Sequence, residues 1–302
     1  MKKGKLKKIL ATGAMGIMAL IIPFAFAGCD KEKTSQPDST IESFNVTFDY
    51  NFDYDITLMF NNFKNEQKIN KDEWITNLPE IKSIYQDYFD GWYIKDSNKE
   101  IENYDFIGGD VSLIARWNKK PYGIYDDGVL VASLEDVLNN QDDNKIYNGT
   151  LVTNAIESRI KGSISNIYLT DDVHNITAIG NKGLKSLEVS LNNEHYSSVD
   201  GVLYNKSLDK LIYYPQSKEG ESLTFLPSIR CIDKFAFKDN ENLERITFSD
   251  LTETINGNCS SPTKKLKEFI VPSSNTSFKS VDVLTTSSNF SFKSVASFII
   301  SS

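Results

Sequence analysis

The chain has 302 residues, of which 33 are basic and 41 acidic, for a net charge of −8. Residues 1–28 hold five lysines and no acidic residue, so the remainder carries a net charge of about −13. Such acidity argues against nucleic acid as a partner and against adhesion of the protein surface to an anionic membrane. An aromatic content of 12% favours β-rich structure.

The N-terminus has the pattern of an export signal. Its lysine cluster precedes an apolar run from Ile9 to Ala27, and the run ends in Phe26-Ala27-Gly28-Cys29. This end resembles the box of bacterial lipoproteins, in which the cysteine receives a diacylglyceryl group and the preceding bond is cut. The resemblance implies lipidation of Cys29 and loss of the signal peptide, residues 1–28. An uncleaved membrane helix is the alternative, because about 19 apolar residues approach the roughly 20 of a spanning helix.

Either reading places the rest of the chain on the extracytoplasmic side, because the lysine cluster holds the N-terminus inside. We therefore expect a cell-membrane protein that faces the cell surface and contacts the membrane through the lipid on Cys29. Residues 29–43 are polar and without periodicity, which predicts a flexible tether.

Apolar and polar residues alternate from Phe44 to Phe52, which predicts a half-buried strand. A second alternation at 56–60 predicts a hairpin partner for that strand. Apolar residues then recur at spacings of three and four between 74 and 88, which predicts a helix that starts or kinks at Pro79.

Three motifs mark the first domain: FNVTF at 44–48, FDGWYIKD at 89–96 and VSLIARW at 111–117. Together they resemble the internalin B-type repeat, a small β-grasp module of bacterial surface proteins, over residues 44–117. The resemblance brings no catalytic residue with it. We interpret Trp92 and Trp117 as core residues, because rings of this size bury a large apolar area.

Residues 118–159 are predicted to form a connector with some structure of its own. Asp127-Gly128 lies between two apolar runs, which predicts a hairpin. Ser133 precedes a short apolar-periodic segment at 134–138, which predicts a capped helix. The acidic stretch 141–144 lacks the spaced ligands of a calcium loop and is interpreted as a solvated turn.

From about Ile160 the chain repeats itself in short strand-like triplets. The first two triplets are about 20 residues apart and the last three about 23, within the range of leucine-rich repeats. They lie at 167–169, 187–189, 223–225, 246–248 and 269–271. Each triplet places two apolar residues inward and its central residue outward. The central residues are predicted to form one exposed row, the outward row: Tyr168, Glu188, Thr224, Thr247 and Ile270.

The residues between the triplets sharpen this prediction. Residues 226–229, 232–237 and 243–246 repeat proline, isoleucine, Ala-Phe and leucine positions, and 196–214 form a hairpin insert. These landmarks resemble the BspA-type leucine-rich repeat over residues 160–282. The predicted fold is α+β and mostly β, with a small β-grasp-like module followed by a short leucine-rich-repeat solenoid. Residues 283–302 are predicted to be a poorly ordered tail.

No catalytic constellation stands out. The two histidines, His174 and His195, have no recognisable partners, and no paired metal motif, phosphate loop or nucleophile elbow occurs. We therefore predict that the chain is not an enzyme and uses no cofactor. Cys231 and Cys259 form a disulfide or remain buried thiols, two alternatives that the sequence leaves open.

Both resemblances imply a surface protein that adheres to or binds an extracellular protein or glycan, with the outward row as the contact surface. The alternative is a structural envelope lipoprotein, or spacer, without a specific ligand, and a third reading is a degenerate fragment without function. Exposed aromatic residues on the row would favour binding, whereas a uniformly polar row would favour the spacer.

Overall fold

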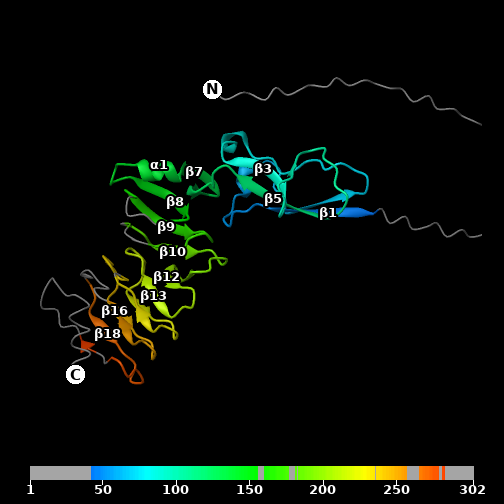
Figure 1. The fold of residues 1–302 in the computed structure, drawn as a ribbon. Helices are drawn as coiled ribbons and strands as arrows, with labels where there is room; N and C mark the ends of the chain where they lie inside the picture. The colour runs from blue at the N-terminus through cyan, green and yellow to red at the C-terminus, as the bar shows by residue number, and fades with distance from the viewer. Residues whose placement is uncertain are drawn as a thin grey trace, which may run out of the picture. The chain divides into compact units, whose positions relative to one another are not determined.

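The computed structural model describes residues 42–155, 160–176, 181, 183–234, 236–256, 265–278 and 281–282 (Figure 1). All of them belong to one unit that begins at Ile41. Their secondary structure is mostly β, which confirms the β-rich class predicted from the sequence. The lipidation site Cys29, the thiol of Cys259 and the tail 283–302 lie outside the described residues.

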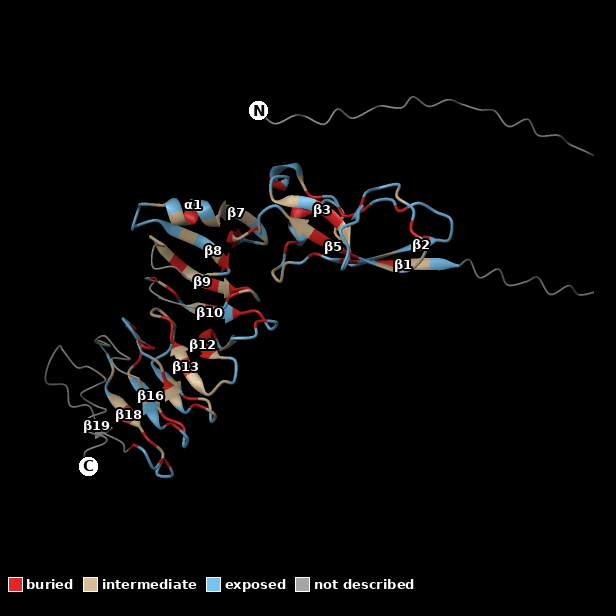
Figure 2. Ribbon diagram, viewed as in Figure 1, coloured by how far each residue is buried: buried red, intermediate tan, exposed pale blue. Residues whose placement is uncertain are grey.

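The first sheet contains the predicted N-terminal module and has the order β2-β1-β5-β3-β4. Its central strand β5 runs parallel to β1 and antiparallel to β3. The strands are β1 (Ser43–Asp49), β2 (Glu66–Asn70), β3 (Phe89–Ile94), β4 (Glu100–Ile101) and β5 (Val111–Trp117). Buried and exposed residues alternate along β1, as its sequence predicts, because one face of the strand packs on the core (Figure 2).

Two local predictions for this module are wrong. The antiparallel partner of β1 is β2, whereas residues 56–60 contain a short 3-10 helix at Thr57–Met59. The segment 74–88 is not an α-helix and holds one 3-10 turn at Ser83–Tyr85. Ile75, Leu78, Ile81 and Tyr85 are buried, whereas Trp74 and Ile84 are exposed. Isolated bridges pair Trp74 with Phe106 and Ile81 with Phe60. Bridges to distant segments therefore replace the local hydrogen bonds that a helix would need.

Aromatic residues fill the core of the module. Trp92 is 3% exposed, and its indole nitrogen donates a hydrogen bond of 2.8 Å to the carbonyl of Pro79. Its ring centre lies 5.2 Å from that of Phe48 and 5.1 Å from that of Tyr50. Trp117 is half-buried and donates to the carbonyl of Tyr50. Both tryptophans thus serve the core, as the sequence indicates.

The second sheet has the order β10-β9-β8-β6-β7. The predicted Asp-Gly hairpin is present between β6 (Gly123–Asp126) and β7 (Val129–Ser133), with positive φ at both Asp127 and Gly128. The predicted helix is α1 (Leu134–Asn139), capped reciprocally by Ser133 and Asp136. The remaining strands are β8 (Ile146–Thr153), β9 (Ser163–Leu169) and β10 (Ser186–Val189). Because β8 pairs with β9 in parallel, most of the predicted connector belongs to the same sheet as the first repeats.

The last two sheets hold parallel ladders with a regular step. In the sheet β14-β16-β18-β19, Ser222 lies opposite Arg245 and Arg245 opposite Glu268, a step of 23 residues each time. In the sheet β11-β12-β13-β15-β17, the predicted hairpin insert joins short strands in parallel register. The strands are β11 (Tyr196–Val199), β12 (Val202–Asn205), β13 (Lys210–Tyr213), β14 (Ser222–Thr224), β15 (Cys231–Ile232), β16 (Arg245–Thr247), β17 (Thr254–Ile255), β18 (Glu268–Ile270) and β19 (Val281–Asp282).

Three buried asparagines join successive turns of this region, here called the repeat region (160–278). The amide of Asn240 donates to the carbonyls of Pro215 and Gln216, and its oxygen accepts from the backbone of Asn242 and Leu243. Asn193 and Asn275 bond in the same way, and all three are at most 8% exposed. Each asparagine side chain thereby provides hydrogen-bond partners for backbone groups of two chain segments, and these groups have no strand partner at that point.

Candidate binding surface

The strand register places three residues of the outward row side by side. Thr224 pairs with Thr247, and Thr247 with Ile270, across β14, β16 and β18. Their neighbours Phe225, Phe248 and Phe269 are buried on the other side of the strands, as alternation requires. Thr224 is exposed, and Thr247 and Ile270 are half-buried. These three residues form the C-terminal part of the row.

The N-terminal part of the row lies in another sheet, so the five residues do not form one continuous ladder. Tyr168 of β9 pairs with Glu188 of β10, which is exposed as predicted. Tyr168, which the pattern predicts to be exposed, is half-buried, as are Thr247 and Ile270. The Tyr168 hydroxyl donates 3.0 Å to the carbonyl of Asp53, and its ring packs 5.1 Å from Tyr54. A contact with the N-terminal module therefore occupies Tyr168.

Charged side chains beside the C-terminal part of the row pair across successive strands. Arg245 Nε lies 2.8 Å from Glu268 Oε2, and Lys267 Nζ lies 2.8 Å from Glu244 Oε2. Lys267 also lowers the pKa of Glu244 through their hydrogen bond. Because these pairs neutralise one another locally, the face around the row offers hydroxyl and apolar contacts without a strong net field.

Asp53 joins the N-terminal module to the first repeats. Its Oδ2 accepts from the backbone nitrogen of Asp171 at 2.9 Å, while its Oδ1 is buried and has no hydrogen-bond partner among the residues that the structure describes. Burial raises the pKa of this carboxyl, and the charge of Asp171 acts in the same direction. The junction thus contains one buried acceptor without a donor in hydrogen-bond geometry among the described protein groups.

A second hydrogen bond at the same junction joins Tyr122 to Asp172. The hydroxyl of Tyr122 donates to Asp172 Oδ2 at 2.7 Å, and burial raises the pKa of this tyrosine well above its usual value. Burial also acts to raise the pKa of Asp172, but hydrogen bonds from Thr170 and Tyr122 outweigh it and lower that pKa. Asp172 is therefore an ionised acceptor that holds its neighbours in place, and its oxygens are engaged by protein donors.

Exposed aromatic residues occur on the N-terminal module and not on the row. Trp74 is 60% exposed and Phe106 50% exposed, and their ring centres lie 6.4 Å apart. Tyr104, 72% exposed, has a φ of +75°, a backbone conformation that is rare for an aromatic residue. The apolar spacing at 74–88 predicts Trp74 on a helix face, whereas in the structure Trp74 forms an isolated bridge with Phe106, a residue 32 positions later.

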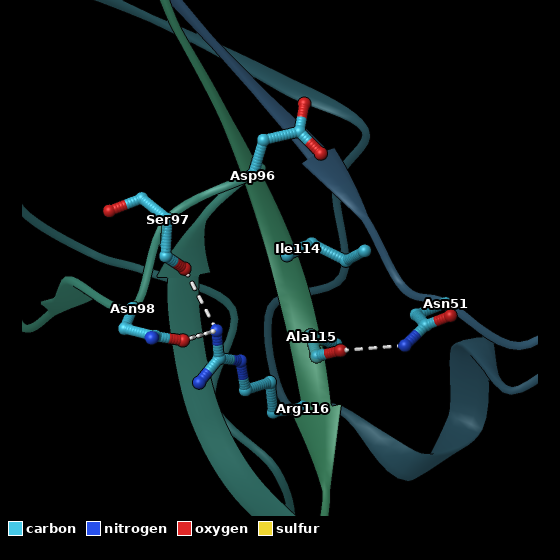
Figure 3. A pocket seen from close by; sticks show the side chains of 7 residues that line it. All are labelled: Asn51, Asp96, Ser97, Asn98, Ile114, Ala115 and Arg116. Atoms are coloured by element: carbon cyan, nitrogen blue, oxygen red, sulfur yellow. Dashed lines mark hydrogen bonds between the residues drawn. The ribbon is translucent and has the colours of Figure 1, made fainter.

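A polar hollow of about 390 Å³ lies beside β5, lined by Asn51, Asp96, Ser97, Asn98, Ile114, Ala115 and Arg116 (Figure 3). The Arg116 guanidinium donates to the carbonyl of Ser97 and to Asn98 Oδ1, and it stacks 3.9 Å from the Tyr93 ring centre. The carboxylate of Asp96 points away from it (Figure 3). Arg116 is thus fixed by hydrogen bonds and ring stacking within its own module.

The described ranges contain few features that would indicate a metal site, a reactive thiol or a membrane-spanning segment. No group of three or more His, Cys, Asp or Glu side chains there is arranged to hold a metal ion. Cys231 is a free thiol whose pKa is raised by burial, so it is not an activated nucleophile. No helix in the described ranges is both long and apolar enough to cross a bilayer.

Comparison with known proteins gives only partial matches. No family model and no curated protein matches the chain. A leucine-rich repeat protein from Eubacterium ventriosum aligns with a TM-score of 0.37 and 25% identity, over 43% of this chain and 38% of that one. The pneumococcal vaccine antigen PcpA aligns with a TM-score of 0.32 and 26% identity, over 39% of this chain and 33% of that one.

A leucine-rich cell surface protein from Faecalibacterium prausnitzii aligns with a TM-score of 0.32 and 22% identity, over 41% of this chain and 34% of that one. Two of these three structures are thus described as leucine-rich, and one of those as a cell surface protein. The chain spans between 33% and 38% of the length of each of these proteins. TM-scores in this range do not establish a shared fold, so no property of these proteins is transferred to this chain.

Proposed function

We propose that this chain is a lipid-anchored cell-surface protein whose repeat region binds an extracellular protein or glycan and performs no catalysis. In this proposal the N-terminal module is an internalin B-type β-grasp domain, and the repeat region is a leucine-rich-repeat solenoid of the BspA type. The observation that carries the proposal is the register of Thr224, Thr247 and Ile270, which aligns one side chain per repeat on the solvent side of three parallel strands.

Such a row suits recognition better than chemistry. Its residues are held by a ladder whose opposite side is the buried core, so the surface is rigid and loses little entropy on binding. It contains two hydroxyl groups and one aliphatic side chain, which fit hydrogen bonding and apolar contact with a neutral ligand. The paired charges beside it exclude neither a protein nor a glycan.

The experiment that tests binding uses the purified full chain on a glycan array and on immobilised extracellular-matrix proteins. The variant Thr224→Arg/Thr247→Arg places two long charged side chains on the row without touching the core. We expect it to lose binding that the unchanged chain shows. The matched control, Ser43→Arg/Thr47→Arg, changes two exposed residues of β1 on the N-terminal module and should bind normally.

If the unchanged chain binds none of these probes, or if both variants bind equally well, the row is not the contact surface. A spacer role would then be the better account, and the polar character of the row supports that second candidate. In that case, removing residues 160–282 in the producing bacterium should alter the envelope, whereas the row variant should not.

The anchor requires its own test, because Cys29 lies outside the described residues. Intact mass and detergent partitioning are compared for the native chain and for Cys29→Ala, both expressed in a bacterium. We expect the native chain to lack residues 1–28 and to carry lipid, and the variant to retain the signal and lack lipid. Retention of the signal in both chains would mean a membrane helix, and cleavage without lipid would mean secretion.

A further inference from the structure

The only two histidines of the chain meet on neighbouring turns of the repeat region. His174 follows the first turn after β9, and His195 precedes β11, yet their ring centres lie 5.0 Å apart at an interplanar angle of 82°. Both side chains are exposed. The sequence places them 21 residues apart with no shared motif, so only the stacking of the turns brings the rings together.

A buried amide fixes both backbones that carry these rings. Asn193, which is fully buried, donates from Nδ2 to the carbonyls of Thr170 and Val173, each at 3.0 Å. Its Oδ1 accepts from the backbone nitrogen of His195 at 2.9 Å and of Tyr196 at 2.8 Å. Val173, next to His174, is buried as well. The separation of the two backbone segments that carry the imidazoles therefore follows from a buried core contact and does not depend on a flexible loop.

This spacing suits a metal ion. Zinc binds imidazole nitrogen at about 2.0–2.1 Å, and two imidazoles on one tetrahedral ion place their ring centres roughly 5 Å apart. Imidazole is also the preferred ligand of copper and nickel among side chains of intermediate softness. Rotation of the two exposed rings about their side-chain bonds is enough to direct one nitrogen of each towards a common point.

The charges around the pair also favour a cation. Acidic residues outnumber bases on the two segments, with Asp171 and Asp172 before His174 and Glu194 before His195. Lys206 is the neighbouring base, and its ammonium is engaged by the carbonyls of Leu191 and Asn193.

We propose that His174 and His195 form a two-imidazole site for a borderline divalent cation such as Zn²⁺, Ni²⁺ or Cu²⁺. No described cluster of three or more ligating side chains exists, so the pair supplies two protein ligands. Water or a donor from a bound molecule fills the other positions, which makes this an open site. The site lies outside the outward row, so it stands independently of the proposed function.

The test is titration of the purified full chain with ZnCl₂, followed by calorimetry and by the imidazole proton signals in NMR. Because the chain has two histidines, two sets of imidazole signals are expected, and both should shift with one equivalent of saturable binding. His174→Ala and His195→Ala should each weaken the binding by at least about tenfold, since changes even in the outer sphere of a metal site have effects of that size.

Two control variants separate the pair from other ligands. Glu194→Gln removes the adjacent carboxylate and should weaken zinc binding less than either histidine variant, whereas Cys231→Ser removes the described free thiol and should leave the zinc affinity unchanged. Because both histidines are exposed, their alanine variants should also keep the melting temperature of the unchanged chain in the absence of metal. Absence of saturable binding, binding retained in both histidine variants, or loss of binding in Cys231→Ser would overturn the two-imidazole site.

Discussion

The N-terminal module and the repeat region hold themselves together in different ways. In the module, the Trp92 ring contacts Phe89 of its own strand and also Phe48, Tyr50 and Phe60, which lie more than 30 residues earlier in the chain. In the repeat region, equivalent residues of successive turns contact each other, as Phe225 and Phe248 do at 5.2 Å. We therefore expect a core substitution in the module to destabilise the whole module, and one in the repeat region to destabilise only the neighbouring turns.

The largest effect is expected for Trp92→Ala. Loss of a fully buried tryptophan costs about 3–5 kcal/mol of unfolding free energy, because a cavity remains and the hydrogen bond to Pro79 is lost. Hydrogen exchange should show lost protection throughout β1 to β5 but retained protection in β14 to β18. The control is Trp74→Ala, an exposed tryptophan of the same module, which should change stability by about 0.5 kcal/mol or less. If Trp92→Ala and Trp74→Ala lowered the unfolding free energy equally, the contrast between the buried and the exposed tryptophan would be refuted.

An intermediate effect is expected for Asn240→Ala. The change leaves buried backbone groups of two adjacent turns without partners, at a cost of about 1–3 kcal/mol. Hydrogen exchange should accelerate near Pro215 and Leu243, while the N-terminal module keeps its rates. The exposed Asn192→Ala is the control and should leave the rates unchanged. Uniform loss of protection along the chain would contradict a locally coupled repeat region.

The smallest effect is expected at the junction, for Asp53→Asn. Because burial raises the folded-state pKa of Asp53, the ionised form destabilises the fold, and this penalty appears as pH rises through the ordinary carboxyl pKa towards the raised one. The variant should equal the unchanged chain at pH 3 and be more stable at pH 7, by about 1 kcal/mol or less because the group is only half-buried. Melting temperatures from pH 3 to pH 7 measure the difference.

The exposed Asp87→Asn is the control for this change and should show no such pH-dependent gain. A loss of stability in Asp53→Asn at pH 7 would mean that the ionised carboxylate is needed at the junction. The hydrogen bond from the Asp171 backbone nitrogen to Asp53 Oδ2 would then stabilise the junction by more than burial of the charge destabilises it.

Features governed by neighbouring or periodic residues were predictable. The Asp127-Gly128 turn and the cap at Ser133 are set by residues two to four positions apart, and the strands of the repeats follow from a hydrophobic period. The linking asparagines were missed although a signal was present. Asn193 and Asn275 each lie four residues after the last apolar residue of a triplet, Val189 or Val271. A polar residue recurring at that place within an apolar pattern marks a buried amide.

The sequence by itself determined the β-rich class, the Asp127-Gly128 hairpin, the hairpin insert, the short helix and the register of the last three triplets, because each depends on local chemistry or on a repeated spacing. Tertiary structure alone decided that β2 pairs with β1, that bridges replace a helix between 74 and 88, and that Tyr168 is covered. It also brought His174 and His195 together. These contacts join residues that are far apart in the chain. They form because they pack together the apolar surfaces that the local elements leave exposed, and the sequence of a single element does not specify that packing.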